Sequence, residues 1–248
     1  MTSYIWQKDN LQAATQGVWQ GEFSTQSTRI TTDTRKIEQG DIFLAIKGDN
    51  FDGHDYVEAA KELGAVAAIV NEPVTSNLPQ LIVGDTKKAL GLLGKYRRDV
   101  HSDLTVVALT VSSGKTTTKH KNGSILCHVA QTLITSGNLK KELGEPIMLL
   151  ELTDEHRFAV MELGANHVGE IAYTSNLVRP DVACVLNIGT AHLGEFGGRA
   201  NIARAKAEIY SSLTAEGVAV VPCGDEFFEF LGVSASQFSV KILSFGEQ

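Results

Sequence analysis

Short apolar runs alternate along this chain with segments whose apolar residues recur every three or four positions. The runs have the length and continuity expected of strands buried in a parallel sheet, and the periodic segments are typical of helices that cover such a sheet. Glycine and proline separate the two kinds of segment. The pattern predicts strands over 41–46, 65–70, 81–83, 104–110, 132–135, 158–163, 182–188, 217–221 and 241–245.

The periodic segments predict the helices. We expect one helix to be capped by Asp55 and to stop at Gly64, because aspartate favours helix N-termini and glycine favours the residue after the last turn. A second helix begins near Asp85 and ends at Arg98, where basic side chains suit a helix C-terminus. Further helices are predicted over 115–129, 168–178 and 200–213.

Strands that alternate with helices predict an α/β fold with right-handed crossovers. We expect two domains, a small α/β domain over 1–84 and a doubly wound, mostly parallel sheet domain over 85–248. The last predicted strand runs almost to Gln248, so we expect the second domain to be incomplete.

Composition narrows the class of protein. Hydrophobic residues make up 43% and charged residues 21% of the 248 residues, which is typical of a soluble globular protein. A net charge of −7 without any basic run argues against a nucleic-acid partner. No apolar stretch reaches the length of a membrane span. Three scattered cysteines indicate reduced thiols, so we expect a cytoplasmic protein.

A loop of small residues follows the predicted strand 104–110 and leads into a helix. It reads Val-Ser-Ser-Gly-Lys-Thr at 111–116, which is the layout of a phosphate-binding loop. In such a loop backbone N–H groups cradle phosphate oxygens, the lysine neutralises phosphate charge and the last hydroxyl reaches Mg²⁺. The motif predicts an ATP site built from Ser112, Ser113, Gly114, Lys115 and Thr116, with Lys115 as a catalytic cation.

One position departs from this motif. The first glycine of the pattern is missing, and Val111 stands in the loop. We expect a Cβ there to crowd a loop that needs unusual backbone angles or a close approach to phosphate. An ordinary strand–turn–helix with an exposed lysine is the alternative interpretation.

Polar residues also follow other predicted strands. Glu162 ends an apolar strand, and His192 lies in a glycine-rich loop after the strand 182–188. Ligands of open α/β sheets bind at the carboxyl ends of strands, so we expect Glu162 to hold Mg²⁺ and His192 to contact metal or phosphate. The alternatives are a solvated glutamate and a structural histidine. Lys206, in a run of alternating charges on a helix, is by itself most simply part of a solvated face.

These motifs stand in the order found in Mur ligases, and the sequence resembles that family. Mur ligases are the ATP-dependent amide-forming enzymes of peptidoglycan precursor synthesis. The loops after Glu162 and around His192 are similar to those of the family member that adds D-alanyl-D-alanine to UDP-N-acetylmuramoyl-tripeptide. The matching motifs are Thr-Val-Ser-Ser-Gly-Lys-Thr at 110–116, Gly-Asn-Leu at 137–139, Glu-Leu-Gly-Ala-Asn at 162–166, Asn-Ile-Gly-Thr-Ala-His-Leu at 187–193 and Ala-Lys-Ala-Glu at 205–208.

The N-terminal part is similar to the UDP-sugar-binding domain of the same family. The similarity lies in Asp-Thr-Arg at 33–35, Gly-Asp-Ile-Phe-Leu-Ala-Ile-Lys-Gly at 40–48 and Asp-Gly-His at 52–54. The resemblance implies that domain 1–84 binds the UDP end of the substrate and that domain 85–248 binds ATP. The implied substrate residues are Thr34, Arg35, Lys47 and His54 near the diphosphate, and Asn138 on the metal and sugar-peptide side.

The resemblance also implies a metal site. Mg²⁺ would be held by Thr116, Glu162 and His192, together with Lys206 after CO₂ has converted it to a carbamate. This carbamate role replaces the interpretation of Lys206 as a surface residue. The resemblance also implies that the catalytic residues are Lys115, His192 and Lys206. The implied substrates are ATP, UDP-N-acetylmuramoyl-tripeptide and D-alanyl-D-alanine, bound by a monomer.

Several features depart from the family pattern. Lys140 and Lys141 stand where the family has amides, Pro-Cys-Gly-Asp-Glu at 222–226 replaces an Asn-x-Asp-Asp run, and the family's third, C-terminal domain has no counterpart. The chain is then a fragment, a degenerate copy or a sequence with errors. We expect it to bind ligands but not to catalyse ligation alone. Two alternatives remain: the ligase that adds the third amino acid, and a non-catalytic module that binds nucleotide or UDP-muramyl-peptide.

Overall fold

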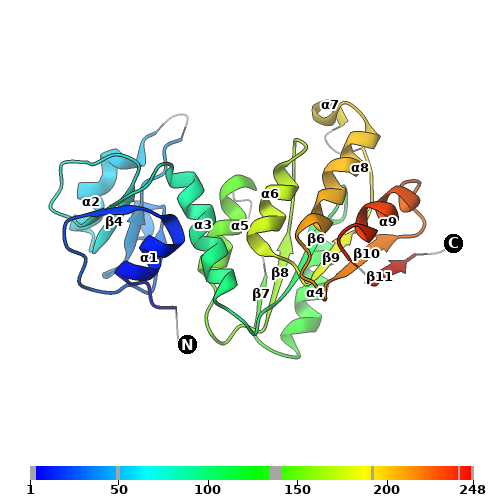
Figure 1. The fold of residues 1–248 in the computed structure, drawn as a ribbon, viewed down its shortest axis with the longest axis horizontal. Helices are drawn as coiled ribbons and strands as arrows, with labels where there is room; N and C mark the ends of the chain where they lie inside the picture. The colour runs from blue at the N-terminus through cyan, green and yellow to red at the C-terminus, as the bar shows by residue number, and fades with distance from the viewer. Residues whose placement is uncertain (1–3, 49–50, 135–140, 191–192, 240, 247–248) are drawn as a thin grey trace. The chain divides into compact units, whose positions relative to one another are not determined.

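The computed structural model describes residues 4–48, 51–134, 141–190, 193–239 and 241–246. The chain forms two compact units (Figure 1). The first comprises Met1–Val100 with Leu149–Asp154, and the second comprises His101–Met148 with Glu155–Gln248.

A five-stranded mixed sheet forms the centre of the first unit. Its strand order is β1-β5-β4-β3-β2, in which β2 to β5 run parallel and β1 pairs antiparallel with β5. The side chains of β3 and β4 are all buried, as the continuous apolar runs predict. The strands are β1 Val18–Gln20, β2 Ile30–Thr31, β3 Ile42–Leu44, β4 Ala67–Val70 and β5 Gln80–Ile82.

The helices of this unit correct one predicted cap. The carboxylate of Asp52, not Asp55, accepts the His54 N–H and begins a 3-10 helix, after which α2 ends as predicted just before Gly64 with its φ of +112°. Asp85 caps α3 as predicted, by accepting the Lys88 N–H. The helices are α1 Lys8–Thr15, η1 Thr34–Lys36, η2 Gly53–Tyr56, α2 Val57–Glu62 and α3 Thr86–Asp99.

The first unit extends past the expected division at 84/85 because α3 packs against α1. The Arg97 side chain of α3 is 1% exposed. Its guanidinium donates to the Leu152 carbonyl at 3.1 Å and to the Asp154 carboxylate at 3.2 Å. A buried cation needs such partners, so these bonds explain why segment Leu149–Asp154 groups with this unit.

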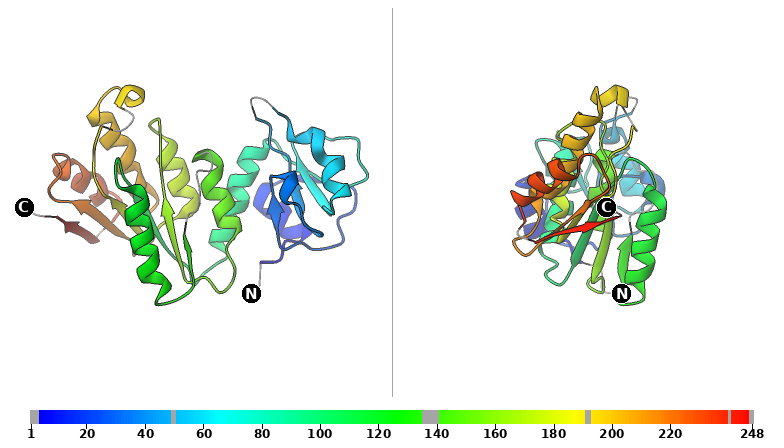
Figure 2. Two further views of the ribbon diagram at one scale, coloured as in Figure 1. Left: turned by 180° about the vertical axis from the view of Figure 1, so that it is seen from behind. Right: turned by 90° about the vertical axis from the view of Figure 1, so that its right-hand side faces the viewer.

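A six-stranded parallel sheet forms the centre of the second unit, in the order β11-β10-β9-β6-β8-β7. Helix α4 lies on one side of it, with α8 and α9 on the other (Figure 2). The predicted doubly wound sheet is therefore confirmed. The strands are β6 Thr105–Thr110, β7 Thr132–Ile134, β8 Phe158–Glu162, β9 Val182–Val185, β10 Val218–Pro222 and β11 Lys241–Phe245.

The chain leaves β6 toward β7 on one side and later crosses to β9 on the other. The carboxyl end of β6 is thus the switch point, where open α/β sheets bind ligands. Within the described residues, no helix is long and apolar enough to cross a membrane. The helices of this unit are α4 Lys115–Cys127, α5 Lys141–Leu150 (in this unit up to Met148), α6 Glu170–Val178, α7 Leu193–Phe196, α8 Arg199–Ala207, η3 Glu208–Ser212 and α9 Phe228–Ser236.

Candidate functional site

The predicted phosphate loop lies between β6 and α4. Gly114 precedes the helix with a φ of +85°, and a Cβ there would meet no atom of the described residues within 4 Å. Glycine is therefore favoured by backbone conformation and not by space. The N–H groups of the first turn of α4 have no acceptor within the helix, so the start of this helix can bind an anion.

Val111 sits in this loop without the strain that we expected. Among the described residues, the non-glycine positions with positive φ are Gln16 and Arg179, so Val111 has an ordinary backbone conformation. Its side chain is 3% exposed and belongs to a core cluster with Leu109 and Val160. The premise that this position requires the backbone freedom of glycine is therefore wrong, and Val111 contributes to the core.

The side chain of Asn187 fixes the middle of the loop. Its Oδ1 accepts the N–H groups of Ser112 at 3.1 Å and Ser113 at 3.2 Å. Its Nδ2 donates to the Ser113 carbonyl at 3.0 Å. We assigned no role to Asn187 from the sequence. The predicted strand 182–188 included Asn187, whereas β9, the strand next to β6, ends two residues before it.

Lys206 reaches the same strand end from α8. It is 9% exposed, and its Nζ donates to the Thr110 hydroxyl at 3.3 Å. The interpretation of Lys206 as part of a solvated face is therefore wrong. Glu208, two residues further along, has a structural role, because its carboxylate accepts the N–H groups of Gly169 at 2.7 Å and Ala172 at 3.0 Å at the start of α6.

Glu162 ends β8 beside β6, where it pairs in register with Leu109. Its carboxylate lies 3.6 Å from the Nζ of Lys119, and the two side chains are 18% and 10% exposed. Lys119 follows Lys115 by four residues in α4, which places both on one face of the helix. The sequence analysis missed Lys119, although this spacing was its signal.

Some predicted site residues cannot be placed. His192 and Asn138 lie outside the described residues, as do the side chains of Lys115 and Thr116. Within the described part of the chain, no group of three or more His, Cys, Asp or Glu side chains could hold a metal ion. The roles assigned to these residues therefore stay predictions.

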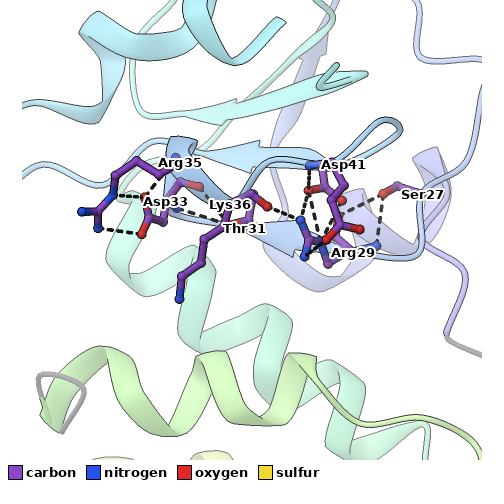
Figure 3. Close-up of polar contacts among 8 residues, drawn as sticks. Ser27, Arg29, Thr31, Asp33, Arg35, Lys36 and Asp41 are labelled. Carbon is purple, nitrogen blue, oxygen red and sulfur yellow. Dashed lines mark hydrogen bonds and ion pairs between the residues drawn. The ribbon is translucent and has the colours of Figure 1, made fainter. Parts of the chain in front are cut away.

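In the first unit, polar contacts organise the loop between β2 and β3 (Figure 3). The Arg35 guanidinium pairs with both oxygens of Asp33, at 2.9 and 2.8 Å, and is 86% exposed. Hydrogen bonds from this guanidinium lower the pKa of Asp33. Arg35 is thus held in one orientation while its side chain faces solvent.

Arg29 holds the base of this loop. Its guanidinium binds both oxygens of Asp41, the carboxylate of Glu38 and the carbonyl of Lys36 (Figure 3). Asp41 is 4% exposed and also accepts the Glu38 N–H at 2.8 Å. The sequence analysis assigned no role to Arg29, which closes the loop that presents Arg35.

The Asp-Gly-His segment packs tightly after β3. A Cβ on Gly53 would lie 2.7 Å from the backbone nitrogen of Ile46, so glycine is needed there for space. His54 is buried, its Nε2 accepts the Asn71 N–H at 3.1 Å, and its Nδ1 therefore carries a proton that it donates to Asp52 at 2.6 Å. Lys47, which is exposed, pairs with Asp52 at 3.0 Å. The ring nitrogens of His54 thus have protein partners, whereas its expected place near a diphosphate is untested.

Comparison with known proteins agrees with this architecture. The model of the Mur ligase middle domain matches residues 109–248, and that of the Mur ligase family catalytic domain matches residues 26–96. The UDP-N-acetylmuramoyl-tripeptide--D-alanyl-D-alanine ligase of Escherichia coli is 49% identical over 192 residues, which cover 77% of this chain and 42% of that protein.

Solved structures give the same result. The structure of MurF from Acinetobacter baumannii has a TM-score of 0.94 and 53% identity, over 99% of this chain and 54% of that one. The structure of MurF ligase from Thermotoga maritima in complex with ADP has a TM-score of 0.79 and 33% identity, over 89% of this chain and 50% of that one. The chain thus spans about half the length of the relatives it matches. Because the middle-domain model matches more than half of its residues, this chain belongs to the Mur ligase family.

Proposed function

We propose that this chain is the UDP-sugar- and ATP-binding part of a ligase that adds D-alanyl-D-alanine to UDP-N-acetylmuramoyl-tripeptide. The choice of substrate rests on the 49% identity to the UDP-N-acetylmuramoyl-tripeptide--D-alanyl-D-alanine ligase of Escherichia coli. The use of ATP is supported by three charged side chains that lie at the strand ends beside the phosphate loop, those of Lys119, Glu162 and Lys206.

In the proposed reaction the terminal carboxylate of the tripeptide attacks the γ-phosphate of ATP. The products of this step are an acyl phosphate and ADP. The amine of the dipeptide then adds to the acyl carbon, and the tetrahedral intermediate releases phosphate as the amide forms. Two anions must meet in the first step, so catalysis depends on positioning and on neutralisation of charge. Lys115 would supply a cation at the phosphates.

Glu162 supports a Mg²⁺ site at this strand end, where Lys119 now pairs with its carboxylate. Mg²⁺ binds through one or two carboxylates together with substrate phosphates, and Glu162 offers a largely buried carboxylate at the switch point. We assign Thr116, Glu162, His192 and carbamoylated Lys206 as its holders. Bound Mg²⁺ would offset the charge that builds up between the carboxylate and the phosphate.

Lys206 suits carbamoylation by its surroundings. Only a neutral amine adds to CO₂, and Lys206 is 9% exposed beside the phosphate loop. Addition gives a carbamate anion and releases a proton. The Thr110 hydroxyl, which accepts from Nζ at 3.3 Å, would stay beside the new group.

In the first unit we assign recognition of the diphosphate to Thr34, Arg35, Lys47 and His54. Arg35 is the strongest candidate, because a guanidinium meets phosphate oxygens with paired, charge-assisted hydrogen bonds. Asp33 now occupies that guanidinium, so a diphosphate would have to share it or displace Asp33. Asn138 would contact the sugar-peptide side. We further propose that the protein works in the cytoplasm as a monomer.

Phosphate release from ATP tests this proposal. The assay compares UDP-N-acetylmuramoyl-tripeptide plus D-alanyl-D-alanine with UDP-N-acetylmuramoyl-dipeptide plus an amino acid, using this chain and a longer protein that contains it. We expect dipeptide-dependent release by the longer protein, loss of it in Lys115→Ala, and little release by residues 1–248 alone. Release with the amino acid instead would identify the ligase that adds the third residue. Binding without release in the longer protein would identify a non-catalytic module.

A further inference from the structure

The ends of β6 and β9 are joined beyond their backbone pairing. The last backbone bond of the pair runs from the Leu186 N–H to the Thr110 carbonyl at 3.0 Å. The next connection is made by the Asn187 side chain, which bonds the backbone of Ser112 and Ser113. An asparagine amide carries the same C=O and N–H groups as a peptide unit. Asn187 therefore extends the ladder into the phosphate loop.

The backbone next to Asn187 is held by hydrogen bonds to residues outside the phosphate loop. The N–H of the next residue, Ile188, donates to the Asp225 carboxylate at 2.8 Å. The carbonyl of Ile188 accepts from Arg199 at 2.9 Å. These bonds fix the backbone that carries the Asn187 side chain to residues after β10 and at the start of α8. The backbone from which the Asn187 side chain contacts the phosphate loop is thus itself held by hydrogen bonds.

The phosphate loop is also closely packed against this segment. A Cβ on Gly189 would lie 3.0 Å from the Cβ of Ser112. The hydroxyl of Ser112 is buried and has no hydrogen-bond partner among the residues that the structure describes. The segment beginning at Asn187 therefore leaves the loop little room to move, and it approaches the loop through a glycine.

We propose that Asn187 is a positioning residue that holds the phosphate loop ready for nucleotide. It takes the N–H groups of Ser112 and Ser113, and the phosphates are then bound by Gly114 and the first turn of α4. This inference rests on the proposed function, and it changes the expected role of Ser112 and Ser113 from phosphate donors to fixed loop residues. A loop that is already ordered before its ligand binds loses little conformational entropy on binding, so the ligand binds more tightly.

Asn187→Ala tests this inference in the chain of residues 1–248, through the affinity for Mg-ADP by calorimetry and the amide exchange of Ser112 and Ser113. We expect about tenfold weaker binding, in line with loss of about 1.4 kcal/mol, and faster exchange at both amides. Affinity for UDP-N-acetylmuramoyl-tripeptide should not change. Asn122→Ala is the matched control, because this side chain bonds the Thr118 carbonyl within α4.

Asn187→Asp separates order from charge. Aspartate keeps an acceptor for the two N–H groups but cannot donate to the Ser113 carbonyl, and it adds a negative charge close to the phosphates. We expect slow exchange at Ser112 and Ser113 together with weaker Mg-ADP binding. Mg-ADP affinity equal to that of the unmodified chain would show that the order of the loop alone sets the affinity and that the added charge has no effect.

Equal Mg-ADP affinity in Asn187→Ala and the unmodified chain would overturn the inference. Tighter binding in Asn187→Ala would also overturn it, because Asn187 would then compete with phosphate for the same N–H groups. If the unmodified chain binds no Mg-ADP, the proposed ATP site in this chain fails. Unchanged exchange at Ser112 and Ser113 would show separately that Asn187 does not order the loop.

Discussion

The two candidate binding regions are built in opposite ways. In the first unit, Arg29 and Asp41 are 12 residues apart along the chain, and Arg35 and Asp33 are 2 apart. In the second unit, Asn187 bonds a residue 75 positions away, and Lys206 bonds Thr110 across 96. The first region is a local loop that presents a cation to solvent. The second forms only when the sheet has assembled, so damage to the sheet should damage the site.

The largest expected effect separates the two arginines of the local loop. Arg29→Ala leaves the buried Asp41 carboxylate without its main partner, so we expect a loss of about 2–3 kcal/mol in the free energy of unfolding. Arg35→Ala removes an exposed pair and should change this free energy by less than about 0.5 kcal/mol. Urea unfolding of both variants measures the difference. Equal losses would mean that Arg29 does not hold the loop.

Glu208 tests the region assembled by the sheet. Glu208→Ala removes a carboxylate that accepts two N–H groups at the start of α6, so we expect a loss of about 1.5–3 kcal/mol in stability. Glu216→Ala, an exposed glutamate in the same unit, is the control. Thermal unfolding of both variants provides the measurement. A Glu208 variant as stable as the control would show that this cap contributes nothing.

Val111 gives a smaller effect with a clear direction. Val111→Ala removes buried apolar atoms from the core cluster with Leu109, which costs about 1.5 kcal/mol in stability. Mg-ADP affinity should not increase, because Val111 needs no special backbone freedom. Val129→Ala, at an exposed position, is the control. Tighter Mg-ADP binding in Val111→Ala would restore the original concern about a side chain in the phosphate loop.

The smallest effect concerns pH and the Asp52 carboxylate. Hydrogen bonds from the His54 backbone and ring and from Lys47 hold the pKa of Asp52 well below its usual range. A lowered folded-state pKa stabilises the fold above the unfolded pKa of about 3.9, and this contribution is lost as the pH falls below that value. Asp52→Asn should therefore lose less stability than the unmodified chain between pH 7 and pH 3. Asp55→Asn, at an exposed neighbour, should behave like the unmodified chain in the same urea titration.

The sequence predicted the parts of the fold that depend on long apolar runs. The central strands β6 and β8 begin and end within one residue of their predicted bounds, because residues buried on both faces of a parallel sheet must be apolar. Strand β9 begins at the predicted residue but ends at Val185, three residues before the predicted end at 188. Strands β1 and β2, with 3 and 2 residues, were missed because they are too short to show a period. The cap of η2 was misplaced because the neighbouring Asp52 and Asp55 are equal candidates by sequence.

The site was predicted in part for a similar reason. The position of Glu162 follows from the rule that polar residues gather at the carboxyl ends of parallel strands, and the phosphate loop was predicted from its motif. Asn187 and Arg29 escaped attention because a side chain that braces another segment leaves no periodic signal. Lys119 was missed although it follows Lys115 by four residues in α4. Lys206 was first taken for a surface residue, since the charges beside it on α8 resemble a solvated face.

The most direct test of two separate binding regions is calorimetry of both ligands on two variants of this chain. We predict that Arg35→Ala weakens UDP-N-acetylmuramoyl-tripeptide binding by about 1.5–3 kcal/mol, the range for hydrogen bonds to charged groups, and leaves Mg-ATP affinity unchanged. Lys115→Ala should weaken Mg-ATP binding by a similar amount and leave the UDP ligand unaffected. Equal loss of both ligands in either variant would contradict the account, as would a chain that binds neither ligand.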